Sequence, residues 1–247
     1  MISLADLHTH TTASDGTLSP QALVNEVLIL QIQRPALRVI AVTDHDTVAG
    51  AYTALLYLKE HHAGAELEII PGAEISTTDG HIVALNIRRD IPKGMNAADT
   101  IDAIHAEGGI AIAVHPYAYL PFLKGLKGIK GLITDPKVGR AVDAVEVCNA
   151  NPTETINNHV TRWVNRRNLH RPEVGGSDSH FRSAIARAVT SFPGRTANDL
   201  LQAIREGTTR AVGSVYGPFS LYEYVRDRLA WKEFCQEDPI ARVFHEW

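Results

Sequence analysis

Two histidines near the start of the chain, His8 and His10, are spaced to bind one metal ion together. They follow a short apolar run that predicts a strand over residues 3–7. Side chains two positions apart on a strand point to the same face, so both imidazoles can reach one ion. A complete site needs further ligands from elsewhere in the chain.

Other predicted strands carry residues of the types that bind metals. The strands are predicted over 38–42, 67–75, 80–86, 110–114, 144–148 and 174–177. Residues at or just past the ends of these strands are Asp44, His45, Glu74, His115, Asn149, Asp178 and His180. The candidate ligands are six histidines and three carboxylates: His8, His10, His45, His81, His115, His180, Asp15, Glu74 and Asp178. Imidazole and carboxylate together suit zinc, manganese or iron, and about three protein ligands serve an ion with an open position. Nine candidates therefore indicate two or three divalent ions.

The elements between the strands predict an α/β fold. Helices are expected over 20–33, 48–61, 96–106, 153–168 and 197–205, which alternate with the strands and predict parallel pairing. An open doubly wound sheet and a barrel both fit this alternation. Strand ends converge on one mouth in a barrel but spread along a line in an open sheet, so the ligand pattern favours a barrel.

The chain is expected to form a single domain. The barrel is predicted over residues 1–220, and a C-terminal helical tail over 221–247 is predicted to pack on its outside. Residues 117–140 combine glycines with lysines and predict a loop with short helical turns, or a lid over the site.

Composition narrows the partners that this chain is expected to bind. Its net charge of −4 over 247 residues gives no basic footprint for duplex DNA or a membrane surface. The cysteines Cys148 and Cys235 are too few for a disulfide framework and suit a reducing compartment. No signal peptide or membrane-spanning run is evident. A soluble cytoplasmic protein that binds neither duplex DNA nor a membrane is therefore expected.

The residue types point to phosphoester hydrolysis. Ions roughly 3.5–4 Å apart serve displacement at phosphorus, where one activates hydroxide and another takes up charge. No serine or cysteine lies in a recognisable nucleophile motif, and none is needed if water attacks. We therefore expect a metal-dependent phosphoesterase in which Glu74, Asp178 and His180 act through the bound ions.

Six motifs in order resemble the PHP (polymerase and histidinol phosphatase) phosphoesterases. They are DLHTHT at 6–11 with SDG at 14–16, TDHDT at 43–47, PGAEIS at 71–76, HIVALNI at 81–87, HP at 115–116 and GSDSH at 176–180. This resemblance implies a distorted (β/α)7 TIM-like barrel with a trinuclear metal site.

The resemblance also implies how the ligands divide among the ions. The first ion would be held by His8, His10, Glu74 and Asp178, the second by Asp15, His45 and His180, and the third by Glu74, His81 and His115. Histidinol phosphatases often have histidine at the Asp15 position. The carboxylate is more similar to the branch of nucleoside 3′,5′-bisphosphate phosphatases and short-RNA 5′-exonucleases.

Several alternatives stay open at this point. A phosphomonoester on a nucleotide or oligonucleotide end is the expected substrate; histidinol phosphate is the main rival, and a non-catalytic metal-bound scaffold is another. Asn149, Arg182 and Arg187 are candidates for substrate contacts, although capping of the next helix is slightly favoured for Asn149. Asp44 is expected either to orient a ligand imidazole or to cap a helix.

Overall fold

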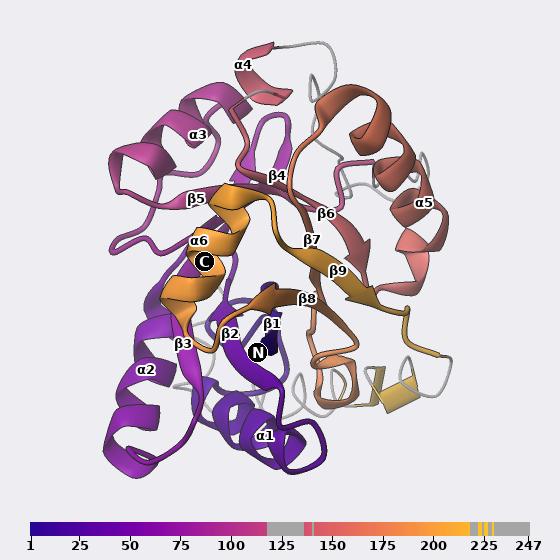
Figure 1. Ribbon diagram of the computed structural model, residues 1–247. Helices are drawn as coiled ribbons and strands as arrows, with labels where there is room; N and C mark the ends of the chain where they lie inside the picture. Colours follow the sequence, from indigo (N-terminus) through magenta and orange to yellow (C-terminus); the bar gives the residue numbers. More distant parts are fainter. Residues whose placement is uncertain (118–135, 140, 218–221, 224, 227–228, 230–247) are drawn as a thin grey trace.

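A computed structural model describes residues 1–117, 136–139, 141–217, 222–223, 225–226 and 229. In this part of the chain, helices lie around the outside of one strongly curved sheet (Figure 1). Its strands are β1 Ile2–Asp6, β2 Leu37–Val42, β3 Glu68–Thr77, β4 Gly80–Leu85, β5 Ile110–Ala113, β6 Ala144–Asn149, β7 Glu173–Gly176, β8 Ala188–Pro193 and β9 Arg210–Gly213. Their order across the sheet is β7-β6-β5-β4-β3-β2-β1-β8-β9. The helices are α1 Pro20–Gln33, α2 Ala49–His61, α3 Ala97–Ala106, α4 Pro136–Gly139, α5 Thr155–Val164 and α6 Ala197–Glu206.

The sheet curls into a nearly closed barrel, as the sequence predicted. The seam lies between β7 and β8, where the Thr190 hydroxyl bonds to both the N–H and the carbonyl of Gly175 at 2.9 Å. A side chain at Gly175 would place its Cβ 2.7 Å from the carbonyl oxygen of Val189, so only glycine allows this approach. The next residue, Gly176, likewise leaves room for His8, whose Cβ would lie 2.5 Å from an added Cβ. Gly175 and Gly176 thus allow β7 to pack closely against β8 on one side and against His8 on the other.

The expectation of parallel pairing is wrong for two strands. β4 is antiparallel to β3 and β5, while β8 is antiparallel to β1 and β9. Only Thr78 and Asp79 separate β3 from β4, and two residues can join strands only as a hairpin. This reversal matters for the site, because it brings the start of β4 to the end of the barrel where the parallel strands finish.

The helices follow their sequence signals closely. Helix α1 spans the predicted residues, with the Ser19 hydroxyl oxygen accepting from the N–H of Ala22 and Pro20 in the first turn. The predicted helix over 153–168 divides into a 3-10 turn Pro152–Glu154, helix α5 and a π-helical end Asn165–Leu169. The expected tail helix and the possible lid over 117–140 lie largely outside the described residues.

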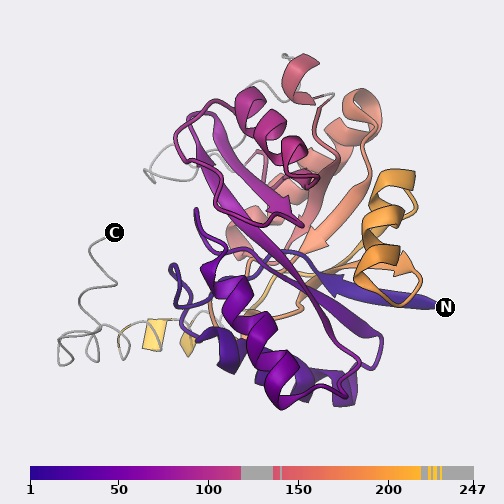
Figure 2. The same cartoon turned by 90° about the vertical axis from the view of Figure 1, so that its left-hand side faces the viewer.

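One end of the barrel is closed by packing. Helix α6 contributes Leu200 and Ile204 to a core cluster that includes Val39, Leu85 and Phe192 from the barrel wall. Figure 2 shows α6 beside the N-terminus, at the end where β1 begins. The carboxyl ends of the parallel strands therefore open at the other end. None of the helices in the described segments has the length and apolar character needed to span a bilayer.

Candidate metal centre

The barrel mouth gathers the predicted ligand residues from six strands. His8 and His10 follow β1, His45 follows β2, His115 follows β5, and Asp178 and His180 follow β7. His81 lies at the start of the reversed strand β4 and reaches the same mouth. Residues far apart in sequence are thus brought together, as a barrel requires.

Glu74 differs from the expected placement after a strand end. It lies inside β3, which continues to Thr77 to complete the hairpin with β4. Its backbone pairs with His45 in an isolated parallel bridge. The side chain is buried and points into the mouth, where the sequence placed it.

Glu74 is the centre of the cluster. Its Oε2 lies 3.2 Å from Nε2 of both His8 and His10. Its Oε1 lies 2.9 Å from Nδ1 of His81 and 3.0 Å from Nε2 of His115. One carboxylate therefore faces imidazoles on both of its oxygens, the arrangement needed to bridge two ions.

Three groups of side chains offer ligand atoms within 4.8 Å of one another. They are His8, His10, Glu74 and Asp178; His10, Asp15, His45 and His180; and His45, Glu74 and His81. The first group matches the first ligand set implied by the family resemblance. The second adds His10 to the second set, and the third contains His45 where that resemblance implied His115.

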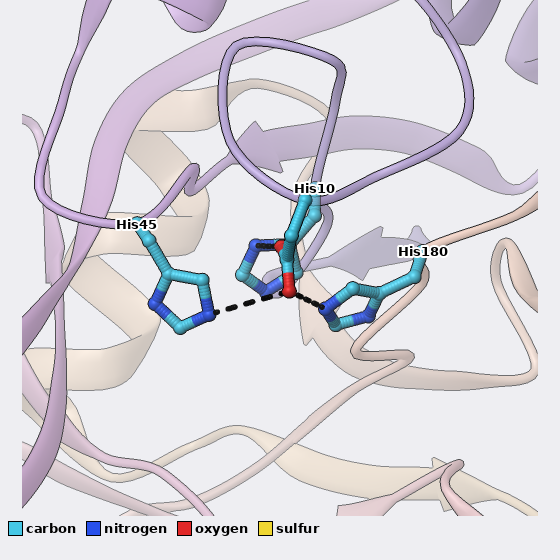
Figure 3. Close-up of side chains that lie close together, drawn as sticks. His10, His45 and His180 are labelled. Carbon is cyan, nitrogen blue, oxygen red and sulfur yellow. Dashed lines mark hydrogen bonds and ion pairs between the residues drawn. The ribbon is translucent and has the colours of Figure 1, made fainter. Parts of the chain in front are cut away.

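The second of these groups lies at the edge of the mouth. Asp15 Oδ2 is 3.1 Å from Nε2 of His180 and 3.9 Å from Nε2 of His45, while its Oδ1 is 3.6 Å from Nδ1 of His10. Figure 3 shows the imidazoles of His10, His45 and His180 turned toward a common carboxylate. These residues come from β1, β2 and β7 and converge without sharing a local motif.

The chemistry of this donor set fits divalent cations. Within the described structure, both ring nitrogens of His10 lie 3.2–3.6 Å from carboxylate oxygens without a well-directed hydrogen bond. Nδ1 of His115 is buried without a hydrogen-bond partner. Nitrogens in this situation are costly unless something else binds them. Imidazole and carboxylate donors on several sides of a polar pocket provide the ligands that zinc, manganese or iron require.

The electrostatics of the cluster also call for positive charge. Burial on its own would raise the pKa values of Glu74 and Asp178, but the surrounding imidazoles hold both well below their usual range. Burial would lower the pKa of His10, yet Asp178 and Glu74 raise it to about 10. The pKa of His115 is raised to about 9 against burial, chiefly by Glu74. The raised pKa values mean that His10 and His115 carry protons that a bound metal ion would displace. Binding of metal ions is therefore coupled to proton release.

Two residues at the mouth have left-handed backbone conformations. His115 has φ +30° and Asp178 has φ +52°, and neither is glycine. Such conformations are sparsely populated and concentrate at functional sites. The turns after β5 and β7 therefore hold these side chains in the mouth at some cost in backbone strain.

A buried carboxylate that sequence analysis missed supports the ligands from behind. Glu146 lies within β6, with Oε1 3.1 Å from Nδ1 of His8 and Oε2 accepting from the N–H of His115. A histidine whose far nitrogen binds a carboxylate is fixed in tautomer and orientation for metal binding. The only signal in sequence was a charged residue between Val145 and Val147 in an otherwise apolar strand.

Replacing Glu146 with glutamine is expected to weaken metal binding by about 10- to 100-fold, because His8 loses the acceptor that orients it. Metal affinity can be measured by competition with a chromophoric chelator. Glu206→Gln, an exposed change at the end of α6, removes the same charge and is the control. Equal affinities in the two variants would show that Glu146 does not position His8.

Asn149 and Asp44 have different roles from those expected. The Asn149 side chain is buried, and its Nδ2 donates to Glu146 at 2.9 Å and to Asp178 at 3.2 Å. It therefore holds a ligand carboxylate and contacts no open space, while Asn151 caps the following turn. The Asp44 carboxylate accepts from the N–H and hydroxyl of Thr11, so it shapes the loop after His10.

The arginines expected to contact the substrate do not lie at the metal centre. Arg182 is exposed and pairs with Glu26 of α1, with Nε 2.7 Å from Oε2. Arg187 donates through Nε to the carbonyl of Ser183 at 2.9 Å. Phe181 is extended, so the side chain of Arg182 points away from that of Phe181, which faces the mouth. Neither arginine lines the pocket at the metal centre.

That pocket has a volume of about 280 Å³ and combines the ligand cluster with an aromatic wall. Its lining residues are Asp15, His45, Glu74, His81, His115, Asn151, Asp178, His180, Phe181 and Tyr216. The rings of Phe181 and Tyr216 meet edge to face with centroids 5.1 Å apart. Neither residue was predicted to lie at the site, because their contact joins segments from separate parts of the chain.

Known sequences include several that are similar to parts of this chain. A sequence model of the PHP-associated family matches residues 156–209. MJ1587, an uncharacterised protein of Methanocaldococcus jannaschii, is 35% identical over 162 residues, covering 63% of this chain and 87% of the relative. The 5′-3′ exoribonuclease Rnm of Escherichia coli is 44% identical over 86 residues, covering 33% of this chain. This match spans only 27% of the exoribonuclease's length.

Solved structures share the fold at low sequence identity. A two-domain protein from Bacteroides vulgatus containing a predicted PHP-like metal-dependent phosphoesterase has a TM-score of 0.65 at 20% identity, covering 86% of this chain and 65% of that one. PsfC from Pseudomonas syringae has a TM-score of 0.68 at 20% identity, covering 93% of this chain and 98% of that one. Endonuclease Q, solved with a 27-mer duplex, has a TM-score of 0.57 at 14% identity, covering 86% and 60%. The expectation that duplex DNA is excluded thus gains no support from these comparisons.

Proposed function

Because the chain belongs to the PHP family of metal-dependent phosphoesterases, we propose that it hydrolyses phosphomonoesters of a nucleotide or of a short oligonucleotide end. The observation that carries the proposal is the position of Glu74, whose two oxygens face imidazoles on opposite sides of one pocket. A carboxylate placed in this way suits neighbouring ions. The nucleotide class is supported by the local identity to exoribonuclease Rnm and by Asp15 at the edge of the mouth.

The side chains at the mouth divide into three proposed ligand sets. They are His8, His10, Glu74 and Asp178; Asp15, His45 and His180; and Glu74, His81 and His115. Two or three divalent ions held there would supply an activated water and take up the negative charge of the phosphoryl oxygens. The identity of the ions, whether zinc, manganese or iron, is left to measurement.

The chain itself orients the ligands and keeps their carboxylates ionised. Asn149 holds Asp178 and Glu146 holds His8 from the buried side. The orientation of these two ligands is therefore fixed before substrate binds. Asp15 and His180 form an ion pair at the partly exposed edge of the pocket. Burial opposes the charge of Asp15, but His180 and the neighbouring imidazoles lower its pKa below the usual range. Asp15 therefore stays ionised and is available as a ligand beside His180.

The pocket suits a phosphate carried on a small group. A volume of about 280 Å³ lies at the lower end of ordinary ligand sites, enough for a phosphate and a sugar. Phe181 and Tyr216 line one side and offer an apolar surface to the rest of the substrate. The net charge of −4 disfavours long nucleic acids, since phosphate contacts need lysine or arginine.

The proposal is tested by phosphate release from the metal-loaded protein. Substrates are an adenosine 3′,5′-bisphosphate, a 5′-phosphorylated pentanucleotide and histidinol phosphate, with chelator-treated protein as the control. We expect kcat/KM for a nucleotide substrate to exceed that for histidinol phosphate by about tenfold or more. The opposite order would establish the histidinol-phosphate activity. Release from none of the three, with ions bound, would leave only the non-catalytic scaffold.

A further inference from the structure

A second cavity, of about 430 Å³, lies between α1 and the segment that follows His180. Its walls are Glu26, Ile29, Leu30, Arg34, Arg182, Ser183, Ile185, Arg187 and Glu223. We call it the arginine cleft after Arg34, Arg182 and Arg187. Three guanidinium groups around one cavity with an apolar floor form a site suited to an anion that carries a flat or apolar group.

Each of these guanidinium groups is anchored through one nitrogen. Nη1 of Arg34 donates to the carbonyl of Ala186 at 2.8 Å, and Nε of Arg187 donates to the carbonyl of Ser183 at 2.9 Å. Nε of Arg182 is held by Glu26. An arginine has five N–H donors, so one such bond fixes the group while donors remain for a ligand. Preorganised arginines lose less entropy when a phosphate binds.

The arginine cleft adjoins the metal centre through four consecutive residues. His180 and Phe181 line the pocket at the metal centre, whereas Arg182 and Ser183 line the arginine cleft. Consecutive Cα atoms are about 3.8 Å apart, so the Cα of Arg182 lies within about 7.6 Å of that of His180. A chain of linked phosphates with one end at the metal centre therefore needs to extend by only a few nucleotides to reach the cleft.

We propose that the arginine cleft binds the phosphodiester backbone of an oligonucleotide downstream of the phosphate at the metal centre. This inference rests on the proposed function, since it assigns that substrate a second point of attachment. Arg182 and Arg187 provide the phosphate contacts, and Ile29, Leu30 and Ile185 provide the surface against which a sugar or base lies. Glu26 is neutralised by Arg182, which leaves Glu223 as the opposing charge.

The test measures binding of an uncleaved probe by fluorescence anisotropy. The probe is a phosphorothioate-linked pentanucleotide with a 5′-hydroxyl and a 3′-fluorescein, presented to the metal-loaded protein. Arg182→Gln combined with Arg187→Gln is expected to raise its Kd about tenfold, because charge-assisted contacts to phosphate are lost. The slope of log Kd against log salt concentration should fall by about one to two, because fewer counterions are released on binding when phosphate contacts are lost.

A matched control removes the same charge at the opposite end of the barrel. Arg205→Gln with Arg210→Gln changes α6 and β9, away from the mouth, and should alter Kd less than twofold. Glu223→Gln should tighten binding, a gain that misfolding cannot mimic. Equal losses in both double variants, or no change in the cleft variant, would overturn the proposal. Absence of phosphatase activity in the wild type would instead refute the proposed function and leave this binding result standing.

Discussion

Glu74→Gln is expected to lower kcat/KM by at least about a thousandfold and to reduce the number of ions bound per chain. Loss of a residue that only supports a metal ligand costs about 10- to 100-fold, and loss of a shared ligand should cost more. The glutamine keeps the shape of the side chain, but its amide NH₂ only donates. This NH₂ group would take the place of one carboxylate oxygen, facing either His8 and His10 or His81. Phosphate release and elemental analysis of the reconstituted variant measure the two effects.

Glu66→Gln is the matched control for Glu74→Gln. Glu66 lies just before β3, beyond the far end of the strand that carries Glu74, and pairs with Arg38 and Arg195 on the surface. Removing its charge should leave activity and metal content within twofold of the wild type, because exposed ion pairs contribute little. If Glu74→Gln kept full metal content and activity within tenfold of the wild type, Glu74 would not be a shared ligand.

The positions of the candidate ligands were predictable because each depends on local order along the chain. His8 and His10 lie two residues apart just after β1, and His115, Asp178 and their neighbours follow apolar runs whose ends meet in any barrel. His81 reaches the mouth for a different reason, since β4 runs antiparallel to its neighbours. The two-residue connection before Gly80 was the signal for that hairpin.

The supporting residues depend on packing across the barrel, which periodicity does not report. Glu146 sits in an apolar strand, and its role appears only when β6 lies beside His8. Arg182 is two residues from His180, but the extended conformation at Phe181 turns its side chain away from the metal centre. Distance along the sequence was therefore a poor guide for substrate contacts. The pairing of Phe181 with Tyr216 is a further case, because it joins two distant loops.

Asp6→Ala is expected to lower the free energy of unfolding by about 3 kcal/mol or more. The buried Asp6 carboxylate accepts four hydrogen bonds, including those from the N–H groups of Ser177 and Ala186. It therefore ties β1 to the turn after β7 and to Ala186, two residues before β8. Each buried donor left without an acceptor costs about 1–3 kcal/mol, so losing this side chain should exceed most single substitutions.

Urea denaturation in the presence of a chelator isolates this effect from metal binding. Asp102→Ala removes an exposed carboxylate from α3 and should change stability by less than about 0.5 kcal/mol. Asp6→Asn keeps one acceptor oxygen and should fall between Asp6→Ala and the wild type. A loss below 1 kcal/mol for Asp6→Ala would mean that the four donors find other partners.

The same aspartate predicts how stability depends on pH. Burial raises the pKa of Asp6 from 3.8 to about 6, against the hydrogen bonds from Ser177, Ala186 and His8 that lower it. The folded chain thus binds this proton more tightly than the unfolded chain, so the resulting stability is present below pH 3.8 and is lost as pH rises through about 6. Asp6→Asn lacks the titration. The stability of the wild type relative to Asp6→Asn should therefore be about 1 kcal/mol greater at pH 5 than at pH 7.5, and a constant difference would refute the raised pKa.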